Sequence, residues 1–178
     1  MTNTLTDPLL LAGKLLANVA KWLMAAGAAI AVLCIPFLIF MRDDINANLR
    51  TEIGDPTLVF PLWQAVAAVA LAAIAVALMF VFFDRLARII GTVSEGDPFV
   101  PANAERLSQM GWVMLAVQVL AIPLAGLGLF VAKTLEDQGG TIDAGIDLSG
   151  ILMVILLFIL ARVFKRGAEM RADLEGTV

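Results

Sequence analysis

Residues 61–83 read PLWQAVAAVALAAIAVALMFVFF and contain no charged side chain. The hydrocarbon core of a bilayer is about 30 Å thick, so a helix needs roughly 20 apolar residues to cross it. Three further blocks with almost no charge lie at residues 19–41, 109–132 and 148–164, and the charged residues gather between the blocks. This spacing predicts an all-α polytopic membrane protein, with four transmembrane helices in an up-down bundle and helical extensions on the cytoplasmic side.

The composition of the chain agrees with a membrane protein. Hydrophobic residues make up 61% of the 178 residues and the mean hydropathy is +0.93, which excludes a water-soluble domain. The apolar runs continue past the length of a barrel strand and lack the alternation of one. Helices satisfy their own backbone hydrogen bonds in lipid. We therefore expect residues 1–178 to form a single integral membrane domain.

Few residues of the chain are suited to catalysis. The chain has no histidine, which excludes imidazole ligation of a metal or haem, and its single cysteine, Cys34, excludes an intrachain disulfide. Asp43 and Asp44 are adjacent carboxylates, but neighbouring side chains on a helix point apart and no third ligand accompanies them. The sequence predicts a protein that is not an enzyme, has no catalytic residue and holds neither a cofactor nor a metal.

Caps and breakers place the first two helices. An oxygen-bearing cap followed by proline, at Thr6, Asp7 and Pro8, predicts the start of the first helix. We expect residues 42–61, which are polar and contain two prolines, to form a loop with a short helical turn. The second helix should extend beyond the membrane and end at about Val93.

The later helices follow from the same signals. A Gly-Asp-Pro turn at residues 96–98 separates the second helix from the third, for which Asn103 is the predicted cap. Asp147 or Ser149 is the predicted cap of the last helix. We expect this helix to continue unbroken through Arg162 to Leu174.

Lysine and arginine are unevenly distributed between the two sides of the predicted bundle, and this bias predicts its orientation. One side, formed by both termini and the middle loop, holds nine: Lys14, Lys21, Arg85, Arg88, Arg106, Arg162, Lys165, Arg166 and Arg171. The other side holds three: Arg42, Arg50 and Lys133. We expect both termini and the middle loop to be cytoplasmic.

Polar residues at membrane depth would indicate transport. No Asp, Glu, Lys or Arg falls in the middle of a predicted span, and Gln64 and Gln118 are the strongly polar residues within or near the apolar cores. Each glutamine can be satisfied by an interhelical hydrogen bond. A small transport or channel component that acts as a homo-oligomer, with a path along Gln118, is the alternative function.

The charged end of the last helix changes sign along its length. Its first part is basic, at Arg162, Lys165 and Arg166, which suits anionic lipid headgroups and sets topology. Acidic residues, Glu169 and Asp173, follow together with apolar ones. A mixed surface of this kind also suits a soluble protein partner.

Several short motifs resemble those of the bacterial membrane protein family DUF 2975. The motifs are Gly96-Asp97-Pro98-Phe99, Asn103-Ala104-Glu105-Arg106-Leu107, Gly111-Trp112, Leu160-Ala161-Arg162-Val163-Phe164, Gly167 and the tail from Asp173 to Val178. Asp97 stands where the family commonly has Asn. The resemblance implies a four-helix protein of the bacterial cytoplasmic (inner) membrane with no established activity. Members are often encoded beside a helix-turn-helix regulator, which implies a regulatory partner.

These observations combine into a functional hypothesis. The protein is predicted to be a partner-binding scaffold in the lipid bilayer that controls a cytoplasmic helix-turn-helix transcriptional regulator and does not itself contact nucleic acid. The predicted contact residues lie in the middle loop and the last helix: Arg85, Arg88, Asp97, Phe99, Arg106, Arg166, Glu169 and Asp173.

Overall fold

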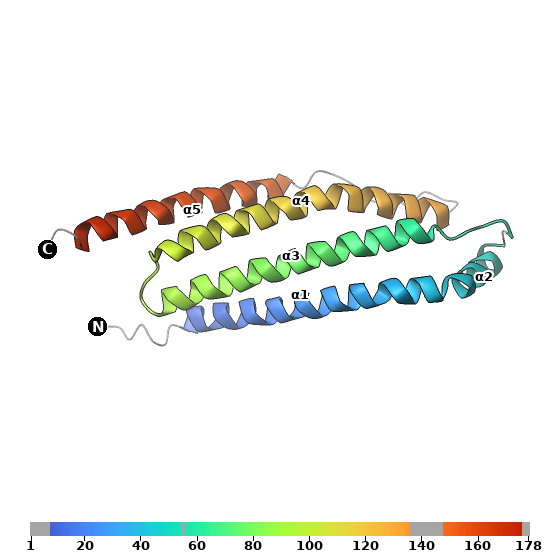
Figure 1. The fold of residues 1–178 in the computed structure, drawn as a ribbon, viewed down its shortest axis with the longest axis horizontal. Helices are drawn as coiled ribbons and strands as arrows, with labels where there is room; N and C mark the ends of the chain where they lie inside the picture. Colours follow the sequence, from blue (N-terminus) through green and yellow to red (C-terminus); the bar gives the residue numbers. More distant parts are fainter. Residues whose placement is uncertain (1–7, 55, 136–147, 176–178) are drawn as a thin grey trace. The chain divides into compact units, whose positions relative to one another are not determined.

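The computed structural model describes residues 8–54, 56–135 and 148–175, and the regular secondary structure within these ranges is α-helix. No strand occurs within these ranges. The five helices, labelled in Figure 1, are α1 (Pro8–Phe40), α2 (Arg42–Ile53), α3 (Leu62–Ser94), α4 (Pro101–Leu135) and α5 (Leu148–Glu175). The prediction of an all-α fold is confirmed.

Four of these helices are long and apolar enough to cross a membrane. They are α1 and α3 over their full lengths, Pro101–Thr134 of α4 and Leu148–Leu174 of α5. Each covers one of the predicted apolar blocks to within one residue and extends beyond it. The prediction of four membrane-spanning helices is therefore confirmed, and the fold is that of a multi-pass membrane protein.

The described residues divide into two compact units. Unit 1 comprises residues 8–25, 77–118 and 148–175, and unit 2 comprises residues 26–54, 56–76 and 119–135. Helix α5 lies entirely in unit 1 and α2 entirely in unit 2, whereas α1, α3 and α4 contribute a segment to each.

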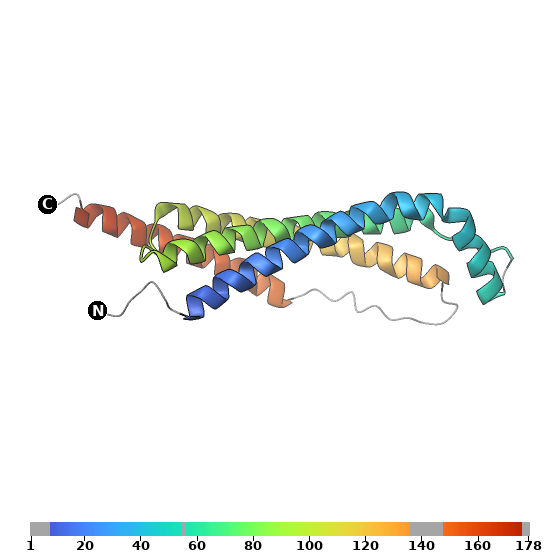
Figure 2. The same cartoon turned by 90° about the horizontal axis from the view of Figure 1, so that it is seen from below.

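Unit 1 is built from neighbouring antiparallel segments. Gly13 of α1 faces Ile90 of α3, and Lys21 of α1 pairs with Asp84, which precedes Ile90 on α3. Helix α5 lies beside the first half of α4 (Figures 1 and 2). The buried centre of the unit is apolar and draws on α3, α4 and α5: Ile89, Leu107, Met110, Leu157 and Ala161.

Unit 2 contains a helix where the sequence suggested a loop. Residues 42–53 form α2, which turns away from the direction of α1 in Figure 2, so the predicted loop with a short turn is wrong over this part. Asp43 and Asp44 occupy the first turn of α2, where carboxylates interact favourably with the helix dipole, and Gly54 ends it with a left-handed φ of 75°. Asn46, which is buried, accepts a hydrogen bond from the Phe60 N–H at 2.8 Å and fixes α2 to the segment before α3.

The remaining helix ends largely follow the predictions. Helix α3 ends at Ser94, one residue beyond Val93, and α5 continues unbroken past Leu174 as expected. Ser149 lies inside α5 and is not its cap. The other predicted caps, Thr6, Asp7 and Asp147, lie outside the described residues.

Candidate functional site

The turn between α3 and α4 has a well-defined hydrogen-bonded shape. Gly96 adopts a left-handed φ of 85° and donates its N–H to the Val93 carbonyl oxygen at 3.1 Å, while the Asp97 N–H donates to the Thr92 carbonyl oxygen at 3.0 Å. This pair of bonds is the Schellman arrangement, in which a glycine ends a helix and satisfies its last carbonyl groups. Pro98 follows at once and prevents the helix from continuing.

The side chain of Asn103 stabilises this turn through hydrogen bonds. This side chain is fully buried, and its Nδ2 donates to Thr92 Oγ1 at 2.7 Å and to the Pro98 carbonyl oxygen at 3.0 Å. Its Oδ1 accepts a hydrogen bond from Arg106 Nη1 at 2.8 Å. The prediction that Asn103 caps α4 is wrong, because α4 already begins at Pro101, whose missing N–H suits the first helical position. Asn103 instead joins the end of α3 to the start of α4.

The same turn is docked on α5. The Phe99 ring lies 5.5 Å from the Phe164 ring, centroid to centroid, and rests on Gly167. A Cβ atom at Gly167 would lie 2.6 Å from Phe99 Cδ1, which is closer than van der Waals contact allows. Asp97 forms an ion pair with Arg171 of α5. We call this assembly of Asp97, Phe99, Phe164, Gly167 and Arg171 the turn–α5 platform.

The predicted contact residues do not all meet at this platform. Asp97 and Phe99 belong to it. Arg106 is not part of the platform, but it donates a hydrogen bond to Asn103, whose side chain holds the same turn. Arg166 and Glu169 are exposed on the same stretch of α5, and Asp173 is exposed further along this helix.

Arg85 and Arg88 belong instead to a cluster around Asp84. Arg88 Nε lies 2.9 Å from one carboxylate oxygen of Asp84 and Arg85 Nη1 lies 3.8 Å from the same atom, while Lys21 Nζ lies 3.3 Å from the other oxygen. The cluster links α1 to α3. Sequence reasoning missed Asp84 and Lys21, although the spacing of Asp84 and Arg88 by four residues favours an ion pair on one helix face.

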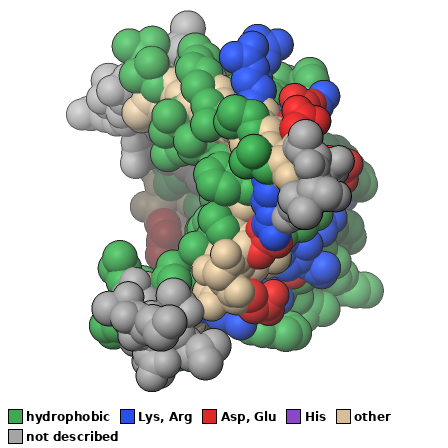
Figure 3. Space-filling model, turned by 90° about the vertical axis from the view of Figure 1, so that its left-hand side faces the viewer, with side chains coloured by type: hydrophobic (Ala, Val, Ile, Leu, Met, Phe, Trp, Pro, Cys, Tyr) green, Lys and Arg blue, Asp and Glu red, His purple; other side chains and the backbone are tan. Residues whose placement is uncertain are grey.

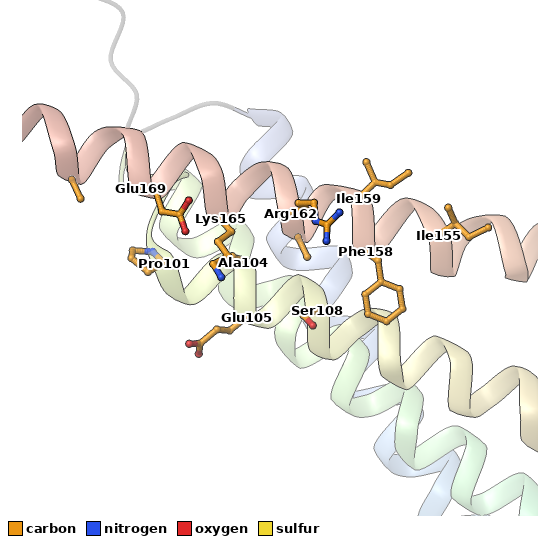
Figure 4. Close-up of a pocket in the computed structure, with 13 residues that line it drawn as sticks. Pro101, Ala104, Glu105, Ser108, Ile155, Phe158, Ile159, Arg162, Lys165 and Glu169 are labelled. Carbon is orange, nitrogen blue, oxygen red and sulfur yellow. The ribbon is translucent and has the colours of Figure 1, made fainter.

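A groove of about 940 Å³ lies between the first turns of α4 and the middle of α5 (Figure 4). Its apolar part contains Phe158, which points from α5 toward α4 in Figure 4. Its polar part contains Lys165 and Glu169, which also point toward the start of α4. Gln118, on which the transport alternative depends, is half-buried on α4 and does not line this groove.

Charged side chains of both signs gather where α3 ends and α5 continues. Figure 3 faces unit 1 from the left-hand side of Figure 1 and shows basic and acidic side chains next to one another, with apolar side chains beside them. Within the three described ranges, no three His, Cys, Asp or Glu side chains are grouped so as to hold a metal ion. The surface is therefore equipped with ion-pairing and hydrogen-bonding groups.

Four spanning helices and a charged, ordered interhelical turn define a multi-pass α-helical membrane protein. More particularly, the chain belongs to the family described as "Protein of unknown function (DUF2975)", whose sequence model matches residues 47–178. The matched region includes the turn–α5 platform and the groove. No curated protein and no solved structure matches the chain.

Proposed function

We propose that this protein is a non-enzymatic regulatory scaffold of the bacterial cytoplasmic membrane, and that its turn–α5 platform binds a cytoplasmic helix-turn-helix regulator. The observation that carries this proposal is the docking of Phe99 on Gly167. This contact brings the middle loop and the last helix, which are far apart in sequence, into one surface that a partner protein can bind.

The orientation in this proposal rests on charge. Nine of the twelve basic residues lie toward the termini and the α3–α4 turn, and basic residues near the ends of spans are retained on the cytoplasmic side. With both termini in the cytoplasm, the platform and the end of α5 face the compartment in which DNA-binding regulators act.

The exposed surface around the platform suits a protein partner. Met170 and Leu174 are 63% and 74% exposed on the part of α5 beyond its basic segment. Arg166 and Glu169 are exposed beside them. Interfaces combine apolar anchors with arginine and a polar rim, so this mixture offers both affinity and orientation to a partner.

Co-purification with a cytoplasmic helix-turn-helix regulator of the same organism tests the proposal. The full-length chain, tagged and extracted in mild detergent, is expected to retain the purified regulator at micromolar concentration. Charge reversal at Arg166→Glu and Glu169→Arg together should reduce retention about tenfold or more, because like charges would then face one another. Lys133→Glu, an exposed change at the other end of α4, is the matched control and should have no effect.

Two results would overturn the proposal. One is that the wild-type chain retains no regulator under conditions in which it remains folded. The other is that retention is unchanged both by the charge reversals and by scrambling of residues 96–106.

A further inference from the structure

The groove between α4 and α5 changes character in a fixed order along α5, from apolar to basic to acidic. We propose that it is a binding site for a phospholipid with an ethanolamine headgroup. The order of the side chains matches the order of the groups in such a lipid, which has acyl chains, then a phosphate and then an ammonium group.

The apolar end of the groove suits an acyl chain. Ile155 and Ile159 are 50% and 55% exposed there, and Phe158 contributes its ring. Small side chains on α4 and α5, such as Ala104 and Ala161, leave the room between the helices. Burial of apolar surface against a lipid chain also restores van der Waals contacts that an open groove lacks.

The middle of the groove suits the phosphate. Arg162 is the first charged residue along α5, and Lys165 follows one turn later. Both side chains are exposed, and neither forms an ion pair or hydrogen bond with another described residue. Long basic side chains at the end of an apolar helix segment reach the headgroup level, where a guanidinium and an ammonium can donate to phosphate oxygens.

The outer end of the groove is acidic, so it suits a positively charged group of the ligand and not a negatively charged one. Glu169 follows Lys165 by one helical turn, about 6 Å along the axis, and Glu105 lines the α4 side. Neither carboxylate is paired within the described part of the chain. Two carbons separate the phosphate from the ammonium in ethanolamine, so a phosphate at Lys165 would place the ammonium near Glu169.

The balance of charge selects among the common headgroups. Two basic and two acidic side chains match a zwitterion, whereas an anionic phosphatidylglycerol would leave the carboxylates without a partner. A choline headgroup is also zwitterionic but has no N–H to donate to Glu169. Ethanolamine is the headgroup that satisfies both pairs of side chains.

This site shares Glu169 with the proposed partner surface, but its two basic residues, Arg162 and Lys165, are not among the partner contacts. Arg166 is adjacent to Lys165 in sequence and is also exposed, yet it does not line the groove. The lipid proposal therefore does not rest on the proposed function, and it is tested with purified protein and lipid alone.

Native mass spectrometry of the delipidated full-length protein tests the proposal. Phosphatidylethanolamine, phosphatidylcholine and phosphatidylglycerol with identical acyl chains are titrated separately. We expect the ethanolamine lipid to bind about tenfold more tightly than either of the others, the size of effect that one or two charge-assisted hydrogen bonds produce. Equal binding of all three lipids, or tighter binding of phosphatidylglycerol, would overturn the proposal.

Matched variants assign the lipid to the groove. Arg162→Gln with Lys165→Gln should weaken binding of the ethanolamine lipid about tenfold or more. Glu105→Gln with Glu169→Gln should abolish the preference for ethanolamine over choline. Arg166→Gln, the control on the same helix, should leave both quantities unchanged. All five side chains are exposed or half-exposed, so the fold tolerates these changes, and undiminished selectivity in both double variants would contradict the proposal.

Discussion

Phe99 and Gly167 are matched to one another in size. The aromatic ring occupies the space that a side chain at position 167 would need, and it lies between the α3–α4 turn and α5. Aromatic rings bury a large area and make directional contacts with other rings, here with Phe164. At the scale of single residues, the platform therefore depends on one position having no side chain.

Replacement of Gly167 by Ala should displace Phe99. The new Cβ would lie 2.6 Å from Phe99 Cδ1, so the ring must move outward, and we expect the free energy of unfolding in detergent to fall by about 1–3 kcal/mol. Because the clash involves Phe99 alone among the nearest atoms, Phe99→Ala combined with Gly167→Ala should be no less stable than Phe99→Ala by itself.

Gly91→Ala is the matched control for this prediction. Gly91 also lies in a helix, but a Cβ there meets no atom within 4 Å. Its replacement should be neutral or stabilising by up to about 1 kcal/mol, because alanine favours the helix over glycine. Thermal unfolding that ranks Gly167→Ala level with Gly91→Ala would show that the ring does not occupy the space above Gly167.

At the scale of helices, Asp84 joins α1 to α3. Its carboxylate contacts Lys21 of α1 at 3.3 Å and Arg88 of its own helix at 2.9 Å. The side chains of Lys21 and Asp84 are only 18% and 19% exposed, whereas that of Arg88 is 57% exposed. The contact between the two helices is thus less hydrated than the contact within α3, so it is less weakened by solvent screening.

Asp84→Asn should weaken the pairing of α1 with α3. The change leaves Lys21 charged, mostly buried and without its carboxylate, so we expect a loss of about 1–3 kcal/mol in the free energy of unfolding. Chemical unfolding in micelles at two ionic strengths measures this loss, which should change little with salt. Glu95→Gln, an exposed carboxylate on the α3–α4 turn, should be nearly neutral, and an equal effect of both variants would contradict the role of the cluster.

The sequence predicted helices better than it predicted contacts between them. Long uncharged blocks and a Gly-Asp-Pro turn are local signals, so the four spans and the end of α3 agree with the structure. Helix α2 was missed because its polar composition resembles that of a loop, although Asp43, Asp44 and Gly54 mark its two ends. These local signals for a helix were present, but α2 lacks the periodic apolar residues from which a helix is usually predicted.

The site could be predicted only in part, for the same physical reason. Asp97 and Phe99 were identified by their motif, but their partners lie on α5, and pairing over such a distance leaves no local pattern. Asn103 has the residue type of a cap, and only the start of α4 at Pro101 shows that its amide reaches back to α3 instead. The groove depends on which faces of α4 and α5 meet.

At the scale of the whole molecule, the distribution of charge predicts an orientation that labelling can measure. After Cys34→Ala removes the native thiol, Glu52→Cys on α2 and Glu95→Cys on the α3–α4 turn each offer one exposed position. With cytoplasmic termini, a membrane-impermeant maleimide should label position 52 in intact cells and position 95 only after permeabilisation. The reverse pattern would place the platform outside the cell, and the cysteine-free parent controls for background.

The pairing of Asp97 with Arg171 also has a consequence for biosynthesis. These residues are 74 positions apart in the chain. At a synthesis rate of about 5–20 residues per second, the α3–α4 turn is synthesised roughly 4–15 s before its partner on α5. During that interval Phe99 has no Gly167 to pack on, so the nascent chain presents an aromatic side chain that α5 later covers in part.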